Sequence, residues 1–259
     1  MKAIAAALVR LVALLLTATL ALQAYFLARV ALMRVLDPQS TSFQRSEAGR
    51  LLLTHGKILW SRQWTDYEHI SDHLKRAVIA SEDAGFADHS GIEWDALEQA
   101  FERNQRAQER ADRLNDRLER RAGVAARPAA NAPRVQPKLV GGSTITQQLA
   151  KNLFLAGERN VARKAQEFAI TLMLEALLSK KRILEIYLNN VEWGEGIFGA
   201  QAAARHYFHV DAARLAPLQA AQLAVMLPAP KRFEKRPSSP YVLGRAGTVA
   251  ARMESVEMP

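Results

Sequence analysis

The sequence predicts a mainly α-helical protein that carries one membrane-spanning helix at its N-terminus. Apolar residues recur at helical spacing over several segments, and an uncharged apolar run lies near the start of the chain. No segment shows the alternation of apolar and polar residues that marks a half-buried strand. Helical periods are expected over residues 71–82, 94–121, 145–153, 161–179, 181–190 and 216–227.

The first expected element is the apolar run over residues 11–28, which holds no charged residue and consists mostly of Leu and Ala. Its length is near the lower limit for crossing a bilayer. Lys2 and Arg10 precede it, so the N-terminus is expected to stay in the cytoplasm. A cleaved signal peptide is the alternative, but the run is long for one, and Gln23 and Tyr25 make a poor cleavage region. We therefore expect an uncleaved signal anchor.

The rest of the chain is expected to lie outside the cytoplasm as one domain. A length of 259 residues without an internal repeat suits a single domain with attachments, and 49% apolar residues suffice for a substantial core. The expected divisions are a cytoplasmic N-terminus (1–10), a transmembrane signal anchor (11–33), a juxtamembrane connector (34–70) and the main domain (71–259), in which residues 103–139 form a flexible basic insertion.

The composition narrows the class of partner. Lys and Arg number 35 against 26 Asp and Glu, a formal charge of +9, which suits an anionic membrane surface, a phosphorylated substrate or nucleic acid. No RNP, zinc-finger or basic-zipper pattern is present, so nucleic acid is not expected. The chain has no cysteine, which excludes disulfides and thiolate–metal sites.

The segment Gly141–Asn152 carries the most informative local pattern. Ser143 or Thr144 is expected to cap a helix after two glycines, and such a helix start can bind an anion. Ile145, Leu149 and Leu153 form the apolar stripe of this helix. Thr144, Gln148 and Lys151 share the neighbouring face and offer polar groups to a ligand. A capped amphipathic helix with a solvated outer face is the alternative.

Two adjacent carboxylates, Glu82 and Asp83, end the expected helix before a break that runs to Gly91. A carboxylate beside buried surface and a second carboxylate holds its proton more tightly, which suits a general acid or base. An exposed helix end with ordinary solvated acids is the alternative. His89 in the same break is, by itself, more typical of a structural hydrogen bond than of catalysis.

Arg163, Lys164 and Glu167 open another expected helix. Arg163 precedes Glu167 by four residues, the weaker orientation for helix support, so a local stabilising role explains the pair poorly. Two cations with one acid would suit a phosphate site, and a solvated charged face is the alternative.

The glycines of Gly194–Gly199 match G-x-G-x-x-G, the dinucleotide-binding fingerprint. That fold needs a strand before the motif, whereas the pattern over residues 181–190 is helical. We therefore reject a Rossmann site and expect these glycines to permit tight packing or a turn.

These clusters follow one another in a specific order. The succession is Glu82-Asp-x-x-Phe-x-x-His-x-Gly91, Gly142-Ser-Thr-Ile-Thr-Gln-Gln-Leu-Ala-Lys-Asn152, Arg163-Lys-x-x-Glu167, Lys181-x-Ile-Leu-Glu-x-Tyr-Leu-Asn189 and Gly194-x-Gly-x-x-Gly-x-x-x-Ala-Ala-x-x-Tyr-Phe208. Over residues 74–233 the chain thereby resembles the peptidoglycan glycosyltransferases, which polymerise lipid II into glycan strands. No Ser-x-x-Lys or Lys-Thr-Gly transpeptidase signature accompanies them, so the chain resembles the monofunctional biosynthetic transglycosylases and no transpeptidase activity is expected.

The resemblance implies a lysozyme-like fold with a larger head lobe and a smaller, membrane-facing jaw lobe. It implies a β-1,4 bond formed with inversion and with release of polyprenyl diphosphate. By resemblance Glu82 is the catalytic base, and Glu167 is the second catalytic acid residue, which orients cations or binds Mg²⁺ or another divalent cation at the diphosphate. The connection at residues 103–139 is longer than is usual in the family, and we expect a flap over the substrate groove.

The resemblance also assigns substrate binding and partners. The substrate-binding positions are Asp83, Phe86, His89, Ser143, Thr144, Gln147, Gln148, Lys151, Asn152, Arg163 and Lys164. For Asp83, Phe86, His89, Gln147, Gln148 and Asn152, support of the site is the alternative. The expected partners are lipid II, the growing lipid-linked glycan, membrane lipids and cell-division or elongation proteins. The expected location is the cytoplasmic membrane, with a single span and the catalytic domain on the periplasmic side. A membrane-bound, glycan-cleaving hydrolase and a non-catalytic scaffold that binds the lipid-linked precursor are the alternatives.

Overall fold

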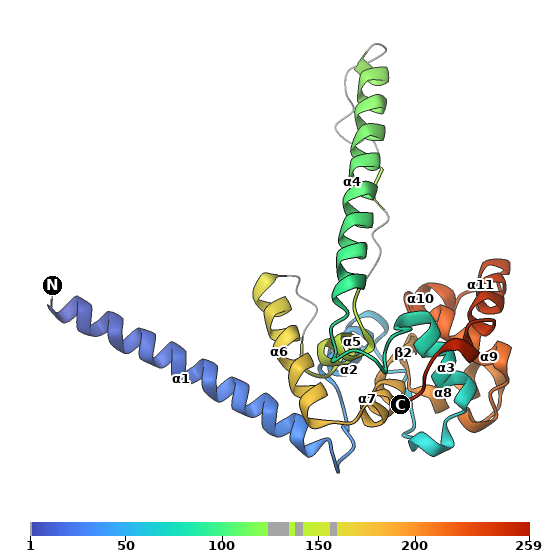
Figure 1. The fold of residues 1–259 in the computed structure, drawn as a ribbon, viewed down its shortest axis with the longest axis horizontal. Coiled ribbons are helices and arrows are strands. Elements are labelled where there is room, and N and C mark those ends of the chain that lie inside the picture. The colour runs from blue at the N-terminus through green and yellow to red at the C-terminus, as the bar shows by residue number, and fades with distance from the viewer. Residues whose placement is uncertain (1, 124–134, 138–141, 156–159) are drawn as a thin grey trace. The chain divides into compact units, whose positions relative to one another are not determined.

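The computed structural model describes residues 2–123, 135–137, 142–155 and 160–259. It divides the chain into two compact units, one made of residues 1–91 and 144–259 and the other of residues 92–143. The helices of the first unit are α1 (Lys2–Leu32), α2 (Ser42–His55), α3 (Asp72–Glu82), α5 (Ile145–Phe154), α6 (Val161–Leu177), α7 (Lys180–Asn190), α8 (Ala200–Phe208), α9 (Pro217–Met226), α10 (Pro230–Phe233) and α11 (Pro240–Ala250). The prediction of a mainly helical protein is confirmed (Figure 1).

Helix α1 contains the apolar run near the N-terminus. Within the described residues it is the one helix long and apolar enough to cross a membrane. Its last turns pack against the rest of the first unit: Phe26 and Val30 are buried, and the Phe26 ring meets the Phe154 ring edge-on at 5.3 Å between centroids. Gln23 and Gln166 of α6 exchange amide hydrogen bonds of 2.8 and 3.0 Å. A polar side chain in the apolar run is thereby satisfied by the domain.

Two groups of packed helices build the core of the first unit, and a hydrogen bond from Gln148 of α5 to Glu82 of α3 connects them. Helices α3, α9 and α11 pack together, and α5 packs against α2, α6 and α7 (Figure 1). The largest fully buried side chains are Trp193, Tyr187, Phe86 and Phe198. Burial of such aromatic rings supplies much of the hydrophobic stabilisation of a core.

A small mixed sheet joins distant parts of the first unit. Strands β2 (Glu192–Gly194) and β3 (Ile197–Phe198) form an antiparallel pair, and β1 (Ser61–Arg62) pairs with β3 in parallel. The glycine-rich motif, residues 194–199, contains the turn between β2 and β3 together with β3 itself. Gly196 has φ +73°, and a Cβ there would lie 2.1 Å from the Leu59 carbonyl oxygen. Glycine is therefore required by both conformation and space, which agrees with the expected turn and not with a dinucleotide fold.

The expected juxtamembrane connector, residues 34–70, contains regular structure. Helix α2 begins with a capping box, in which Thr41 accepts from the Gln44 N–H and Gln44 accepts from the Thr41 N–H. It ends at Gly56, which adopts the left-handed conformation. The buried Leu51 anchors α2 in the first unit. The connector is thus part of the folded domain along much of its length.

The second unit is built on helix α4 (Trp94–Gly123). Glu102–Arg106 and Glu109–Arg113 form ion pairs at i,i+4 spacing, with N···O distances of 3.0 and 3.7 Å. Residues 103–123 of the expected insertion are thus helical, in agreement with the helical period expected over residues 94–121, and such ion pairs support an exposed helix. Residues 124–134 and 138–139 of that range lie outside the described residues.

Candidate active site

Glu82 is the last residue of α3, where the helix gives way to the break that ends at Gly91. Its side chain is partly buried, and its Oε2 accepts a hydrogen bond of 3.0 Å from Gln148 Nε2 of α5. Burial raises the pKa of the Glu82 carboxyl above its usual value; the Gln148 hydrogen bond opposes this shift and the neighbouring Asp83 charge adds to it. Glu82 is therefore a carboxylate with increased proton affinity that still has access to solvent.

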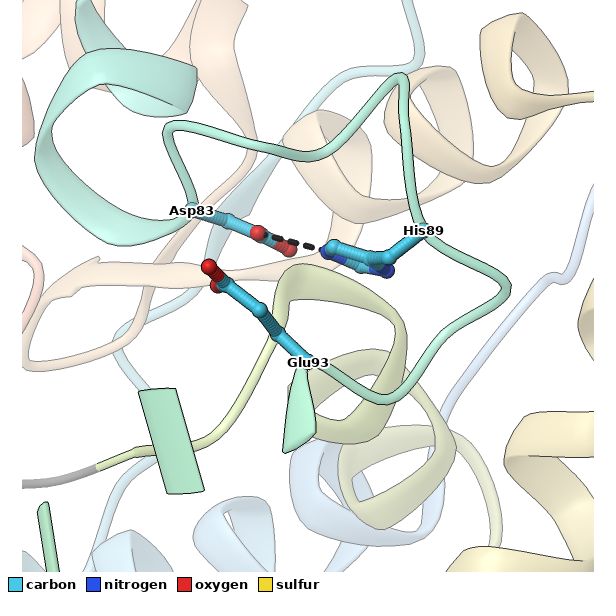
Figure 2. A group of neighbouring side chains, drawn as sticks. All are labelled: Asp83, His89 and Glu93. Carbon is cyan, nitrogen blue, oxygen red and sulfur yellow. Dashed lines mark hydrogen bonds and ion pairs between the residues drawn. The ribbon is translucent and has the colours of Figure 1, made fainter. Parts of the chain in front are cut away.

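Asp83 points into the protein. Its side chain is fully buried, and Oδ2 accepts a 2.9 Å hydrogen bond from the Ile145 N–H at the start of α5. Oδ1 lies 2.8 Å from His89 Nε2 (Figure 2). The Gly91 N–H donates to His89 Nδ1 at 3.0 Å, so Nε2 carries the proton that His89 donates to Asp83. Glu93, also drawn in Figure 2, belongs to the second unit.

For Asp83 and His89 this arrangement favours support of the site over substrate binding. Both oxygens of Asp83 and both ring nitrogens of His89 are occupied inside the chain. The two residues hold the break after α3 against the start of α5. They therefore support the position of Glu82, because a carboxylate that accepts from a helix N–H fixes the helix start relative to its own backbone.

The start of α5 is capped as expected. The capping hydrogen bonds engage side chains that were expected to bind the substrate. Thr144 and Gln147 form a capping box, and the Thr144 hydroxyl donates to the Gly91 carbonyl at 2.7 Å. Both side chains are buried. These contacts favour support of the site for Thr144 and Gln147, and direct substrate binding by them stays a prediction. Ser143 is exposed and belongs to the second unit, so its role stays a prediction.

Phe86 also supports the site from within the core. It is fully buried, and the Lys180 ammonium lies 4.6 Å from its ring centroid. Its ring fills the core under the break after α3 and cannot line a groove. Of the α5 residues assigned to the substrate, Lys151 is exposed, and Gln148 and Asn152 are partly exposed, so these three remain accessible to a ligand.

Glu167 lies on the first turns of α6 together with the two cations expected beside it. Its carboxylate is buried; Oε2 accepts from Arg163 Nη1 at 2.9 Å, and Oε1 forms an ion pair with the Lys164 ammonium. The side chains of Arg163 and Lys164 are partly exposed. The structure thus brings all three residues together, with a buried acid that orients two accessible cations.

The same geometry bears on the expected divalent cation. Mg²⁺ binds through carboxylate and phosphate oxygens in near-octahedral coordination. Both Glu167 oxygens already face cations, whose charge opposes a metal ion at the same place. The donor set around Glu167 does not fit a resident divalent cation, and the mechanism below uses none.

Sequence reasoning missed Tyr187 as a site residue. It lies on α7 and is buried, and its hydroxyl donates to Gln148 Oε1 at 2.9 Å. Tyr187 was visible in the fourth motif, but its period placed it with the apolar core residues of α7. The direction of its hydroxyl depends on the packing of α7 against α5, which no local pattern reveals.

Comparison with known proteins decides the family. The transglycosylase family model matches residues 53–112 and 122–254. The chain belongs to the transglycosylase family. A biosynthetic peptidoglycan transglycosylase of Burkholderia thailandensis is 47% identical over 243 residues, covering 93% of this chain and 84% of the relative. One of Cupriavidus metallidurans is 46% identical over 253 residues, covering 95% of each, and one of Bordetella pertussis is 45% identical over 223 residues, covering 86% and 82%.

The extent of this match agrees with the structure of the transglycosylase domain. The match begins at residue 53, near the end of α2, and so includes part of the range expected as a connector. It leaves a gap only at residues 113–121, which lie within α4. The interruption of the match thus lies in the second unit.

Proposed function

We propose that this transglycosylase polymerises lipid II into β-1,4-linked glycan strands, with Glu82 as the catalytic base. The chain is a peptidoglycan glycosyltransferase by family, and its substrates are lipid II and the glycan strand. The observation that supports the role of Glu82 is its environment: a carboxylate with raised pKa, held by Gln148 at a partly exposed helix end. A carboxylate with increased proton affinity and access to solvent is suited to general-base catalysis.

In the proposed step, the 4-hydroxyl of the incoming lipid II attacks the anomeric carbon of the growing strand. Glu82 takes the hydroxyl proton as the new carbon–oxygen bond forms. The bond between the anomeric carbon and the diphosphate breaks, and polyprenyl diphosphate leaves with the electron pair. Attack and departure occur on opposite faces of the sugar, so the configuration inverts.

The leaving diphosphate needs positive charge more than it needs an acid, because it is a weak base. Arg163 and Lys164 supply two oriented cations on the first turns of α6, and the exposed Lys151 of α5 supplies a third. Glu167 contributes by holding Arg163 and Lys164 in place, and its own oxygens are not available to the substrate.

The apolar helix α1 fits an enzyme of lipid-linked substrates. We propose that it anchors the domain to the cytoplasmic membrane with the active site on the periplasmic side. An anchored enzyme meets membrane-bound substrates in two dimensions, at a high effective concentration. The partners among cell-division or elongation proteins stay a prediction that the sequence alone supports.

A polymerisation assay separates this function from the alternative of glycan cleavage. Purified full-length protein in vesicles is incubated with lipid II in one reaction and with finished glycan strands in another. We expect strand growth and polyprenyl diphosphate release from lipid II, with finished strands unchanged. Shortened strands without growth would instead assign the protein to the hydrolases.

A further inference from the structure

The hydroxyl of Tyr187 is committed to one partner. The side chain is 1% exposed, and in the described part of the chain Gln148 Oε1, at 2.9 Å, is the acceptor recorded for its proton. Burial raises the pKa of Tyr187 well above its usual value, and the charges of Glu82 and Asp83 add to the shift. The hydroxyl therefore holds its proton more tightly than an ordinary tyrosine and acts as a hydrogen-bond donor.

This donor determines which way the Gln148 amide points. A glutamine amide has an acceptor end and a donor end. Because Tyr187 occupies Oε1, Nε2 faces Glu82 Oε2 at 3.0 Å. In the reverse orientation, the amide oxygen would face the carboxylate of Glu82, and two acceptors at that distance repel when Glu82 is ionised. The Tyr187 proton would also lose its acceptor, which is costly for a buried group.

We propose that Tyr187 is a positioning residue for catalysis: its hydroxyl holds the Gln148 amide so that the NH₂ group, and not the oxygen, faces the Glu82 carboxylate. The proposal rests on the proposed function of Glu82 as the base. Three elements take part, since Glu82 ends α3, Gln148 lies on α5 and Tyr187 lies on α7.

The chemical purpose is to offset the burial of the base. Burial and the neighbouring Asp83 favour the protonated form of Glu82, whereas the hydrogen bonds from Gln148 and Ser81 favour the ionised form. Asp83 is itself paired with His89, behind the break. A donor of fixed orientation keeps Glu82 ionised, and thus able to accept a proton, at a lower pH than burial alone would allow.

The test is the pH dependence of lipid II polymerisation by the Tyr187→Phe variant of the full-length protein. We expect the acidic limb of the kcat–pH profile to move up by about one pH unit, because the ionised form of Glu82 loses an oriented donor. On that limb kcat should fall by about tenfold, and it should recover at high pH. A loss of packing alone would lower kcat equally at all pH values.

Tyr207→Phe is the matched control. Its hydroxyl also donates a 2.9 Å hydrogen bond, but to the Trp193 carbonyl and not to the Glu82–Gln148 pair. We expect this variant to keep the wild-type pH profile. Gln148→Met supplies a second, independent variant of similar size. It should shift the acidic limb in the same direction as Tyr187→Phe, and the double variant should shift it no further.

The outcomes separate this proposal from the proposed function. An unchanged acidic limb in Tyr187→Phe or in Gln148→Met would overturn the positioning role. An additional shift in the double variant would also overturn it, since Tyr187 would then act by another route. Full activity of Glu82→Gln, by contrast, would remove Glu82 as the base, whatever the profile of the tyrosine variant.

Discussion

Glu82 and Glu192 are two carboxyl groups of the same unit, and both have a raised pKa. Glu192 lies on β2, is 6% exposed, and has its pKa raised by burial to about 7. Its Oε1 lies 3.5 Å from the Lys231 ammonium and has no hydrogen-bond partner among the described residues. Glu82 is more exposed and accepts from an oriented neutral amide.

The difference shows that a raised pKa alone does not identify a catalytic base. The Glu192 shift comes from burial among charges that serve the fold, with Lys231 opposing the effect and Glu47 and Glu234 adding to it. The raised pKa of Glu82 occurs at a helix end that solvent reaches. There Gln148 donates a hydrogen bond that fixes the orientation of the Glu82 carboxylate. Access and hydrogen-bond geometry therefore distinguish the base from a buried structural acid.

The largest expected difference between Glu82 and Glu192 is in the effect of their substitution on enzymatic activity. Glu82→Gln should lower kcat for lipid II polymerisation by about a thousandfold, because it removes the general base without changing the size of the side chain. Glu192→Gln should stay within about threefold of wild type in the same assay, since it touches no reacting group. Equal losses in the two variants would contradict the distinction drawn between the two carboxyls.

Asp83, which follows Glu82 and holds the break after α3 against α5, should contribute strongly to the stability of the fold. Asp83→Ala removes the acceptor for both the Ile145 N–H and His89, all of them buried or nearly so. We expect a loss of about 3 kcal/mol or more in the free energy of unfolding, measured by denaturant titration. A loss below about 1 kcal/mol would show that the start of α5 does not depend on this carboxylate.

A smaller effect is expected on the pH dependence of stability. The folded protein binds the Glu192 proton more tightly than the unfolded chain does, with a pKa of about 7 against an ordinary value of 4.5. Wild type should therefore lose stability relative to Glu192→Gln as the pH rises from 4.5 through about 7, by about 2–3 kcal/mol. The measurement is the melting temperature of both proteins as a function of pH. A constant difference in melting temperature across this range would contradict the prediction and would show that the Glu192 carboxyl is more solvated.

The sequence predicted the long helices better than the short elements. The periods that begin near Ser71, Trp94 and Val161 correspond to α3, α4 and α6. Helix α2 was missed because it buries few residues and shows no clear apolar stripe. Strands β1, β2 and β3 are two or three residues long, too short for an alternating pattern to be recognised.

The motifs named the residues of the candidate site but not the contacts that each side chain makes. The motifs placed Glu82, Gln148 and Glu167 in the site. They did not reveal that Asp83 and Thr144 point inward, because a capping side chain and a ligand-binding side chain are the same residue types. Tertiary packing decides between those roles, and it also decides the direction of the Tyr187 hydroxyl.

The exchange of hydrogen bonds between Gln23 and Gln166 has a mechanical consequence for the membrane anchor. Gln23 lies within the predicted span, and Gln166 immediately precedes Glu167, which orients Arg163 and Lys164. These two hydrogen bonds tie α1 to the turn of α6 that holds the two cations. With α1 in the membrane, as proposed above, the position of this helix in the bilayer would set the height of the two cations above the lipid.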